Sequence, residues 1–599
     1  MQNGNPDAPQ LSGVESRSEL KMKRWVLWFA ILMPATLLAN DAKLAPELKQ
    51  PAPDQMVSVI VQYKTVPNSV SKDRIRTSGG AVSGDLALVR SVTATVPLSQ
   101  LRQLSDDDAV AYISPDRAVR SHLNNAVPAV LANYAWGLGV DGTGIAVAVI
   151  DSGIHQVSDL QNSGASRIAY SADFVGGGTD DQYGHGTHVA GIIGGNAAYS
   201  SCPTCMVQIR GLAPNVTLIN LRVLDNNGQG SDSTVIAAVQ TAVQLKDLYN
   251  IRVMNLSVGR PVFESYAQDP LCQAVEAAWQ AGIVVVVSAG NDGRDNSLGT
   301  NGYGTIEAPG NDPYVITVGA MNTKGTPDRG DDVMTSYSAK GPTVIDRIVK
   351  PDLVAPGNRV VSLQEPGTLA SQYPQNRVPS SYYDKSTHVT ASNRYFILSG
   401  TSMAAAVVSG AAALMLQHDP SLTPDQVKAR VMKTAYKNLP QYPTVVDGGV
   451  TYNIQYDAFT VGAGYLDVQA ALTNSDLAPG VAKSPTAYYD VNTGNVFFLA
   501  DSATPWGQSA MWGISATSGQ SAMWGASAVW GNNVFLAQSA TGGNSAMWGS
   551  SAMWGNSAMW GDSAMWGNSA MWGSSALWGA QFTGNNPAAA LSRIINGDN

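Results

Sequence analysis

The alternation of apolar strands with helical segments between residues 125 and 473 places the strongest constraint on the fold. Runs such as GIAVAVID and IVVVVSAGN have no polar face, and they alternate with helical stretches such as AAAVVSGAAALMLQH. Strands that are apolar on both faces belong to a parallel sheet that helices cover on both sides. We therefore expect an α/β domain over residues 125–473, with ligands bound at the carboxyl ends of its strands.

The segments on either side of this domain have different patterns. Residues 40–122 combine short apolar strands with a polar helical stretch, which predicts a small α+β domain. Residues 474–503 lose the alternation of strands and helices, and they are expected to be a linker. Residues 581–599 follow a repeat region and are expected to be a C-terminal tail.

Residues 1–39 are expected to be an N-terminal extension and a secretory signal peptide. Lys21 and Arg24 precede an apolar run that ends in small residues at Ala39, and this order predicts a signal peptide with cleavage near Ala39. A chain that started at Met22 would carry a more compact signal. The apolar run is shorter than the roughly 20 residues that cross a bilayer, which disfavours the alternative of a permanent anchor.

A six-residue phrase, typified by NSAMWG, repeats across residues 504–580. Its tryptophans keep one register from Trp506 to Trp578, and an even period places every indole on one face of an extended strand. Three interpretations stay open: a β-solenoid or stacked β array, a flexible low-complexity tail, or a strip of exposed indoles that contacts carbohydrate or a cell surface. No catalytic group recurs in the repeat.

The charge of the chain argues against nucleic acid as a partner. Charged residues make up 14% of the chain, and the net charge is -9. A phosphate backbone attracts proteins that are rich in lysine and arginine. We therefore expect no nucleic-acid partner.

Three cysteines bear on the redox state of the chain. Cys202 and Cys205 form the sequence CPTC, which in an exported protein predicts a small disulfide, with Cys272 left over. Two inert thiols are the alternative.

The six histidines limit the choice of a general base. His185 and His188 lie in DQYGHGTHVAGIIGG, where glycines allow another group to approach closely. Asp151 ends the strand GIAVAVI, and Ser402 stands at the start of an alanine-rich helix, whose positive end stabilises negative charge. Taken alone, Asp151 and Ser402 each fit a helix N-cap. Together, Asp, His and Ser in one α/β domain indicate a hydroxyl nucleophile activated by a base that a carboxylate orients.

Three motifs give the chain a resemblance to a known family. AVIDSGI around Asp151, HGTHVAGIIGG from His185 and SGTSMAAAVVSG around Ser402 resemble the signatures of the subtilisin-like serine proteases, or subtilases, in the family's order. The resemblance implies a subtilisin-like parallel sheet with helices on both faces. It also implies that His185, the first histidine of HGTH, is the catalytic base and that His188 is structural.

Further positions are assigned by the same resemblance. VVVSAGNDG places Asn291 where the family has its side-chain oxyanion donor. MNLSVG matches the strand that pairs with the substrate backbone, which assigns Ser257, Val258 and Gly259 to substrate binding. The specificity pocket is then expected between this segment and Ala289, Gly290 and Asn291, where Glu307 would favour a basic side chain.

The resemblance implies a secreted serine endopeptidase that hydrolyses proteins or peptides through an acyl-enzyme. Residues 40–122 would be a propeptide that inhibits the enzyme before autoprocessing between Arg120 and Val127, with a permanent accessory domain as the alternative. A second functional hypothesis is a surface adhesin or binding protein that uses the tryptophan repeats beside a vestigial protease domain.

Two features of the family are not matched in full. Its members usually carry proline four residues beyond the nucleophile, where this chain has Ala406, a change that should preserve the helix. Many subtilases use structural calcium, but no acidic loop with recognisable ligand spacing is present, so we assign no metal residues.

Overall fold

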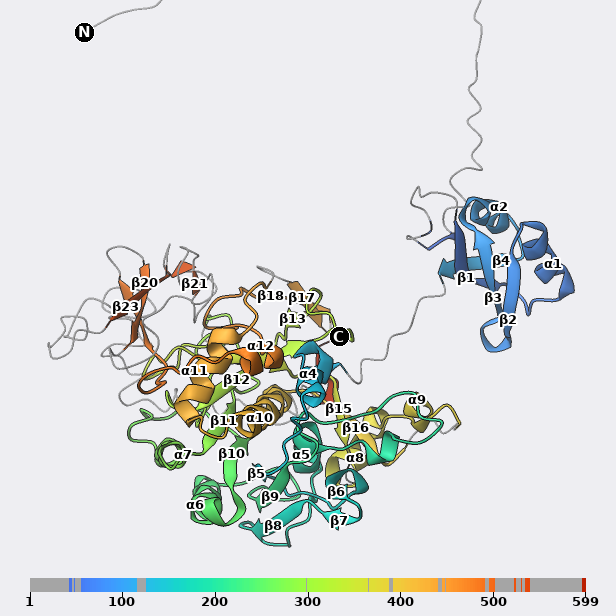
Figure 1. The fold of residues 1–599 in the computed structure, drawn as a ribbon. Helices are drawn as coiled ribbons and strands as arrows, with labels where there is room; N and C mark the ends of the chain where they lie inside the picture. Colours follow the sequence, from blue (N-terminus) through green and yellow to red (C-terminus); the bar gives the residue numbers. More distant parts are fainter. Residues whose placement is uncertain are drawn as a thin grey trace, which may run out of the picture. The chain divides into compact units, whose positions relative to one another are not determined.

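The computed structural model describes residues 43–45, 48, 55–115, 125–297, 299–364, 366–386, 392–439, 444–447, 449–490, 495–500, 522–523, 529–530, 534–538 and 595–598. The expected signal peptide and most of the tryptophan repeats lie outside these residues. Within the described part of the chain, no helix is both long enough and apolar enough to cross a membrane. The chain divides into two compact units, residues 1–119 and residues 120–599 (Figure 1).

The first unit is a four-stranded antiparallel sheet with two helices, in the strand order β2-β3-β1-β4. Val59, Val61 and Tyr63 alternate along β1 with more exposed residues, so that one face of the sheet packs with Ile75 of α1 in a separate core. The described part of residues 40–122 therefore has the α+β character that we predicted. The elements are β1 (Met56–Tyr63), α1 (Ser69–Thr77), β2 (Ala81–Leu86), β3 (Ser91–Pro97), α2 (Leu101–Ser105) and β4 (Val110–Pro115).

The second unit is built on a predominantly parallel sheet with the strand order β13-β12-β11-β10-β5-β9-β8, in which β14 also pairs with β12. Only β13 runs antiparallel to its neighbour among the strands of this sheet. The predicted parallel α/β sheet is confirmed. Its strands are β5 (Ala146–Asp151), β8 (Ile168–Asp173), β9 (Thr217–Arg222), β10 (Ile251–Leu256), β11 (Val284–Ser288), β12 (Ile316–Asn322), β13 (Val333–Met334) and β14 (Leu353–Pro356).

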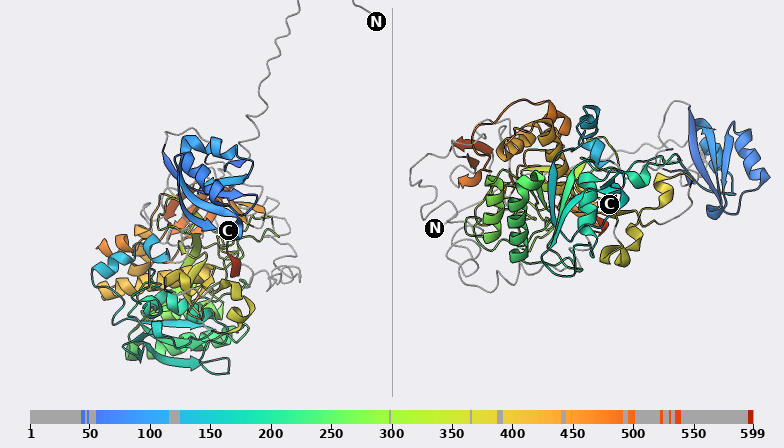
Figure 2. Two further views of the ribbon diagram at one scale, coloured as in Figure 1. Left: turned by 90° about the vertical axis from the view of Figure 1, so that its right-hand side faces the viewer. Right: turned by 60° about the horizontal axis from the view of Figure 1, so that its bottom comes forward.

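Helices cover both faces of this sheet (Figure 2). Helices α5 (His185–Gly194) and α10 (Thr401–His418) pack against each other, and α6 (Asp232–Tyr249) and α7 (Pro270–Gln280) form another packed pair. Every residue of α5 is buried, and α10 is buried from Thr401 to Leu416, because small and apolar residues follow the polar first turn of each helix on nearly every side. These two central helices carry His185 and Ser402 at their first turns.

Shorter elements complete the second unit. They are α3 (Ala126–Ala129), α4 (Asn133–Gly137), β6 (Gln161–Asn162), β7 (Ala165–Ser166), β15 (Val360–Leu363), α8 (Thr368–Gln372), α9 (Ser380–Tyr383), β16 (Tyr395–Leu398), α11 (Pro424–Thr434), β17 (Thr444–Asp447), β18 (Val450–Asn453) and α12 (Val468–Thr473).

The segment that we expected to be a linker, residues 474–503, contains two strands instead. Strands β19 (Thr486–Asp490) and β20 (Asn495–Ala500) pair antiparallel. Phe498 is fully buried and packs its ring against that of Phe459, with 5.7 Å between the centroids. The linker prediction differs from the structure because no helix follows these short strands. The alternation of strands and helices, which identified the other strands in the sequence, is therefore missing here.

A buried network of charged and hydroxyl groups also connects residues 474–503, through Ser484, to the main sheet. The ammonium group of Lys350 lies 2.7 Å from the carboxylate of Asp352, and the ammonium group of Lys428 donates to the hydroxyl of Ser484 at 2.8 Å. The Ser484 hydroxyl in turn donates to Asp352 at 2.6 Å. Burial lowers the pKa of Lys428 to about 7, although the charge of Asp352 opposes the shift. A buried charge requires such partners, so Ser484 belongs to the core of the unit.

Three short strands inside the repeat region, and four residues of the C-terminal tail, are described. Strand β23 (Val534–Gln538) pairs parallel with β20, and β21 (Ala522–Met523) pairs with β22 (Val529–Trp530). The tail expected at residues 581–599 is described at residues 595–598, where Ile595 and Asp598 are buried rather than exposed. The remaining repeats lie outside the described residues, and the three interpretations of them stay open.

Candidate active site

Asp151 and His185 form a buried pair at the carboxyl edge of the parallel sheet. Asp151 is the last residue of β5, and His185 is the first residue of α5. The Oδ1 atom of Asp151 lies 2.7 Å from Nδ1 of His185, and the two residues are 0% and 4% exposed. Because a carboxylate accepts, Nδ1 of His185 carries the proton and Nε2 is left as the acceptor.

The electrostatics of this pair favour a proton on the imidazole. Burial of His185 opposes its protonation, but the charge of Asp151 and the hydrogen bond between the two residues outweigh burial and raise the pKa of His185. The Oδ1 atom of Asp151 also accepts from the backbone N–H of Ser152 at 2.7 Å. The carboxylate is thereby held in the orientation that meets the imidazole.

Asp181 organises the start of α5, and the sequence analysis did not identify it. Its carboxylate is fully buried and accepts from the hydroxyl of Ser152 at 2.8 Å, and from the backbone N–H groups of Gly184 at 2.7 Å and Thr187 at 2.8 Å. Burial raises the pKa of Asp181 despite these hydrogen bonds. The N-cap position of α5 is Gly184, so the sequence signal for Asp181 was only its place four residues before the first histidine of HGTH.

His188 has a different environment from His185. Its Nε2 lies 3.1 Å from the carbonyl oxygens of both Val360 and Phe396, so Nε2 carries the proton and donates to the backbone. Burial, together with the positive charge of protonated His185, lowers the pKa of His188 to about 3. His188 is therefore neutral and links α5 to β15 and β16.

Ser402 lies at the start of α10, beside the end of β10. Its hydroxyl donates to the carbonyl oxygen of Ser257 at 3.4 Å, and the Ser257 hydroxyl donates to the carbonyl oxygen of Ser402 at 3.0 Å. Strands β5 and β10 are neighbours in register, with Ile150 paired to Leu256, so the ends that carry Asp151 and Ser257 are adjacent. In the described part of the chain, the Ser402 hydroxyl bonds to Ser257 rather than to His185.

Asn291 is oriented by a residue that sequence reasoning missed, Thr401. The Oδ1 atom of Asn291 accepts from the backbone N–H of Thr401 at 2.9 Å, which fixes the amide so that Nδ2 is its donor end. The Thr401 hydroxyl also accepts from the N–H of Gly290 at 3.1 Å. Thr401 directly precedes Ser402 within the SGTS motif, so its place in the sequence was a usable signal.

Glu307 lies between the two segments that were expected to form the specificity pocket. A Cβ atom on Gly259 would lie 2.4 Å from Oε2 of Glu307, and a Cβ atom on Gly290 would lie 2.8 Å from its Cδ. Neither glycine could carry a side chain without displacing this carboxylate. The N–H of Glu307 donates to the carbonyl of Ala289 at 3.1 Å, which holds Glu307 beside the segment of Ala289 and Gly290.

The remaining candidates are placed as follows. Ala406 is fully buried in the unbroken helix α10, as expected for a good helix former in place of proline. Cys202 and Cys205 form the disulfide that we predicted, with Cys272 left as a buried free thiol.

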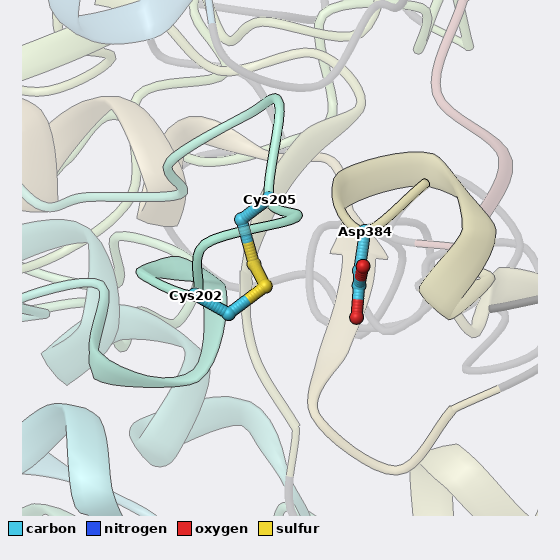
Figure 3. A group of neighbouring side chains, drawn as sticks. All are labelled: Cys202, Cys205 and Asp384. Atoms are coloured by element: carbon cyan, nitrogen blue, oxygen red, sulfur yellow. A yellow bond between two sulfur atoms is a disulfide. The ribbon is translucent and has the colours of Figure 1, made fainter. Parts of the chain in front are cut away.

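Clusters of His, Cys, Asp and Glu side chains in the described residues are the candidates for a metal site. Within the described ranges, the one cluster of three metal-binding side chains is Cys202, Cys205 and Asp384 (Figure 3). Its two sulfurs are bonded to each other, and calcium takes six to eight oxygen ligands. This cluster therefore does not fit the calcium that the family resemblance allows.

Comparisons with known proteins identify the family. Residues 142–464 match the model of the subtilase family. Serine protease AprX of Bacillus subtilis (strain 168) is 36% identical over 376 residues, which cover 60% of this chain and 77% of that protein. The extracellular serine proteinase of Thermus sp. (strain Rt41A) is 34% identical over 59% of this chain and 72% of its own length. Subtilisin E of Bacillus subtilis (strain 168) is 29% identical over 75% of this chain and all of its own length.

Among solved structures, a cold adapted subtilisin-like serine proteinase is 30% identical and covers 50% of this chain and 84% of its own, with a TM-score of 0.35. The family membership follows from the sequence matches. The chain belongs to the subtilase family and is a serine endopeptidase.

The two histidines should titrate far apart. In the Ser402→Ala protein, imidazole NMR signals should show His185 titrating above its ordinary value of 6.5 and His188 staying neutral down to about pH 3. Asp151→Asn should lower the pKa of His185, because it removes the charge that raises it. An unchanged titration of His185 in Asp151→Asn would contradict the assignment.

The raised pKa of His185 also makes the stability of the fold depend on pH. Since the folded-state pKa is raised, His185 stabilises the fold fully below about pH 6.5 and loses this contribution as pH rises through the raised value.

Proposed function

We propose that this subtilase is a secreted endopeptidase made as a zymogen, in which Ser402 is the nucleophile, His185 the general base and Asp151 the carboxylate that orients His185. The observation that carries the proposal is the buried 2.7 Å contact between Asp151 and His185, with Ser402 held at the adjacent strand end. Its substrates are proteins or peptides.

The proton path follows from the tautomer of His185. Ser402 Oγ bonds to the carbonyl carbon of the substrate, and its proton moves to Nε2 of His185 while Nδ1–H stays with Asp151. The amine then leaves with the proton from Nε2, and water releases the acyl group by the same route. The 3.4 Å hydrogen bond from Ser402 to Ser257 is long, so the hydroxyl gives it up at little cost when it turns to His185.

Two donors would hold the oxyanion of the intermediate. They are Nδ2 of Asn291, oriented by Thr401, and the backbone N–H of Ser402 at the positive end of α10. The backbone of Ser257, Val258 and Gly259 would pair with the substrate chain, and Ala289 and Gly290 would lie on the other side of the specificity pocket.

Replacing Asn291 by alanine should slow the chemical step. We expect kcat to fall by about 10²- to 10³-fold, with KM changed by less than about threefold, because the donor acts mainly on the developing oxyanion. Steady-state hydrolysis of a peptide p-nitroanilide measures both constants. Ser402→Ala, as the reference for lost activity, should show no turnover. Full activity in Asn291→Ala would refute the oxyanion assignment.

The position of Glu307 supports a preference for lysine or arginine on the acyl side of the scissile bond. The carboxylate contacts Gly259 and Gly290, which directly follow Val258 and precede Asn291. Glu307 is half-buried, and its carboxylate would stabilise a cationic side chain of the substrate through a charge-assisted hydrogen bond.

Glu307→Gln should reduce this preference without disabling the enzyme. The ratio of kcat/KM for lysine and leucine substrates of otherwise identical sequence should fall by about 10- to 100-fold, as for a lost hydrogen bond to a charged group. Glu276→Gln, the same chemical change on α7, is the matched control and should leave the ratio unaltered. A wild-type ratio below one, or an equal ratio in Glu307→Gln, would exclude the preference.

The first unit is proposed to be the propeptide, with residues 1–39 removed as the signal peptide. Val127 is buried in the core of the second unit, which favours a processing site in the earlier part of the stretch from Arg120 to Val127. The name of the Thermus relative, an extracellular serine proteinase, supports secretion. Contact of the tryptophan repeats with carbohydrate or a cell surface stays a prediction about residues outside the described ranges.

Autoprocessing should be visible in the mass of the active product. We expect the active secreted enzyme to begin between residues 120 and 127, and Ser402→Ala to retain the first unit, since it cannot cut itself. Intact-mass spectrometry with N-terminal sequencing measures both. An active enzyme that still begins near Asn40 would support the accessory-domain alternative.

A further inference from the structure

Residues 595–598 are docked on the second unit in a site made of buried polar groups. One carboxylate oxygen of Asp598 accepts from the guanidinium of Arg294 at 2.5 Å and from the Ser336 hydroxyl at 2.7 Å. The other oxygen accepts from the Ser336 N–H at 2.6 Å. Asp598 is 1% exposed, so these charge-assisted bonds replace all of its hydration.

The backbone of the same segment is also recognised. Asn358 accepts from the N–H of Asp598 at 2.8 Å and donates to its carbonyl at 2.9 Å. Asn376 donates to the carbonyl of Ile595 at 2.6 Å. Gly597 has a φ of +65°, and a Cβ atom there would lie 2.3 Å from Oδ1 of Asn358. The site therefore fits this Gly-Asp sequence and excludes a side chain at position 597.

The residues that hold the segment belong to the loops of the proposed active site. Arg294 lies three residues after Asn291, and Ser399 lies three residues before Ser402. A Cβ atom on Gly597 would approach the Ser399 hydroxyl to 2.4 Å, so the segment packs directly on the nucleophile loop. The two loops are joined in turn by the hydrogen bond from Thr401 to Asn291.

We propose that residues 595–598 are a clasp that holds the Asn291 and Ser402 loops in their working positions, with Asp598 as a positioning residue that acts through Arg294. The clasp rests on the proposed function of those two loops. The clasp also has a consequence for the tryptophan repeats. Residues 501–594, which contain the repeats, connect strand β20 to the clasp, and both of these segments belong to the second unit.

A double-mutant comparison tests this role. Asp598→Asn keeps the size of the side chain and removes its charge. We expect kcat to fall by about tenfold with an unchanged KM, since a displaced catalytic group slows the chemical step. In an Asn291→Ala background the same substitution should change kcat by less than twofold, because the donor that it positions is already gone.

Controls separate positioning from general stability. Asp247→Asn, the same chemical change at an aspartate of α6 whose side chain is 94% exposed, should leave kcat and the melting temperature unchanged. If Asp598→Asn does not fold, Ser336→Ala removes one of the hydrogen bonds to Asp598 and should show the same dependence on Asn291. A chain that stops at Ile594 should recover kcat when the peptide Ile-Asn-Gly-Asp-Asn is added, but not when its aspartate is replaced by asparagine.

The outcomes distinguish the clasp from the mechanism on which it rests. If Asp598→Asn lowers kcat by equal factors in both backgrounds, or lowers only the melting temperature, the clasp is refuted and the mechanism stands. If Ser402→Ala retains activity, the proposed mechanism itself fails.

Discussion

The buried pair of Asp151 and His185 is the interaction on which the rest of this structure depends. Removing a carboxylate and an imidazole from water is costly, and the 2.7 Å contact between them compensates only if both are held in place. The parallel sheet fixes Asp151, because β5 is central and its end cannot move without its neighbours. The fully buried helix α5 fixes His185.

A second set of contacts relates this pair to the proposed nucleophile. Ser152 and Asp181 connect the end of β5 to the start of α5, and Thr401 connects the start of α10 to Asn291. The Asp181 carboxylate and the hydroxyls of Ser152 and Thr401 each make hydrogen bonds to more than one partner. The proposed mechanism therefore relies on Ser152, Asp181 and Thr401 as positioning residues. Because the pKa of His185 is raised, the proposed mechanism predicts opposite pH dependences for stability and catalysis. Protonation of His185 stabilises the fold, whereas the proposed general base is the neutral form.

The main sheet and the candidate site were predictable from the sequence because both leave local signals. Strands that are apolar on both faces identified the parallel sheet, and three motifs placed Asp151, His185 and Ser402 at its edge. Their catalytic roles remain proposals. The choice of His185 over His188 needed the family resemblance, since both lie on one motif and only their contacts, a carboxylate for one and backbone carbonyls for the other, separate them.

What the sequence did not reveal depends on contacts between distant positions. Ser484 and Phe498 join the core through partners far away along the chain, so a segment without helical periodicity read as a linker. Asp598 pairs with Arg294, and nothing near either residue in the sequence indicates the other. Local pattern is informative about strands and motifs, whereas such long-range pairing becomes visible only in the folded chain.

The central claim is that Asp151 and His185 activate Ser402. A fluorophosphonate probe, followed by peptide mass spectrometry of the matured protein, tests it most directly. We predict one adduct, on Ser402, and labelling that slows by orders of magnitude in His185→Ala and Asp151→Asn. An adduct on another residue, no labelling of the matured wild-type protein, or equal labelling rates in the variants would contradict the account.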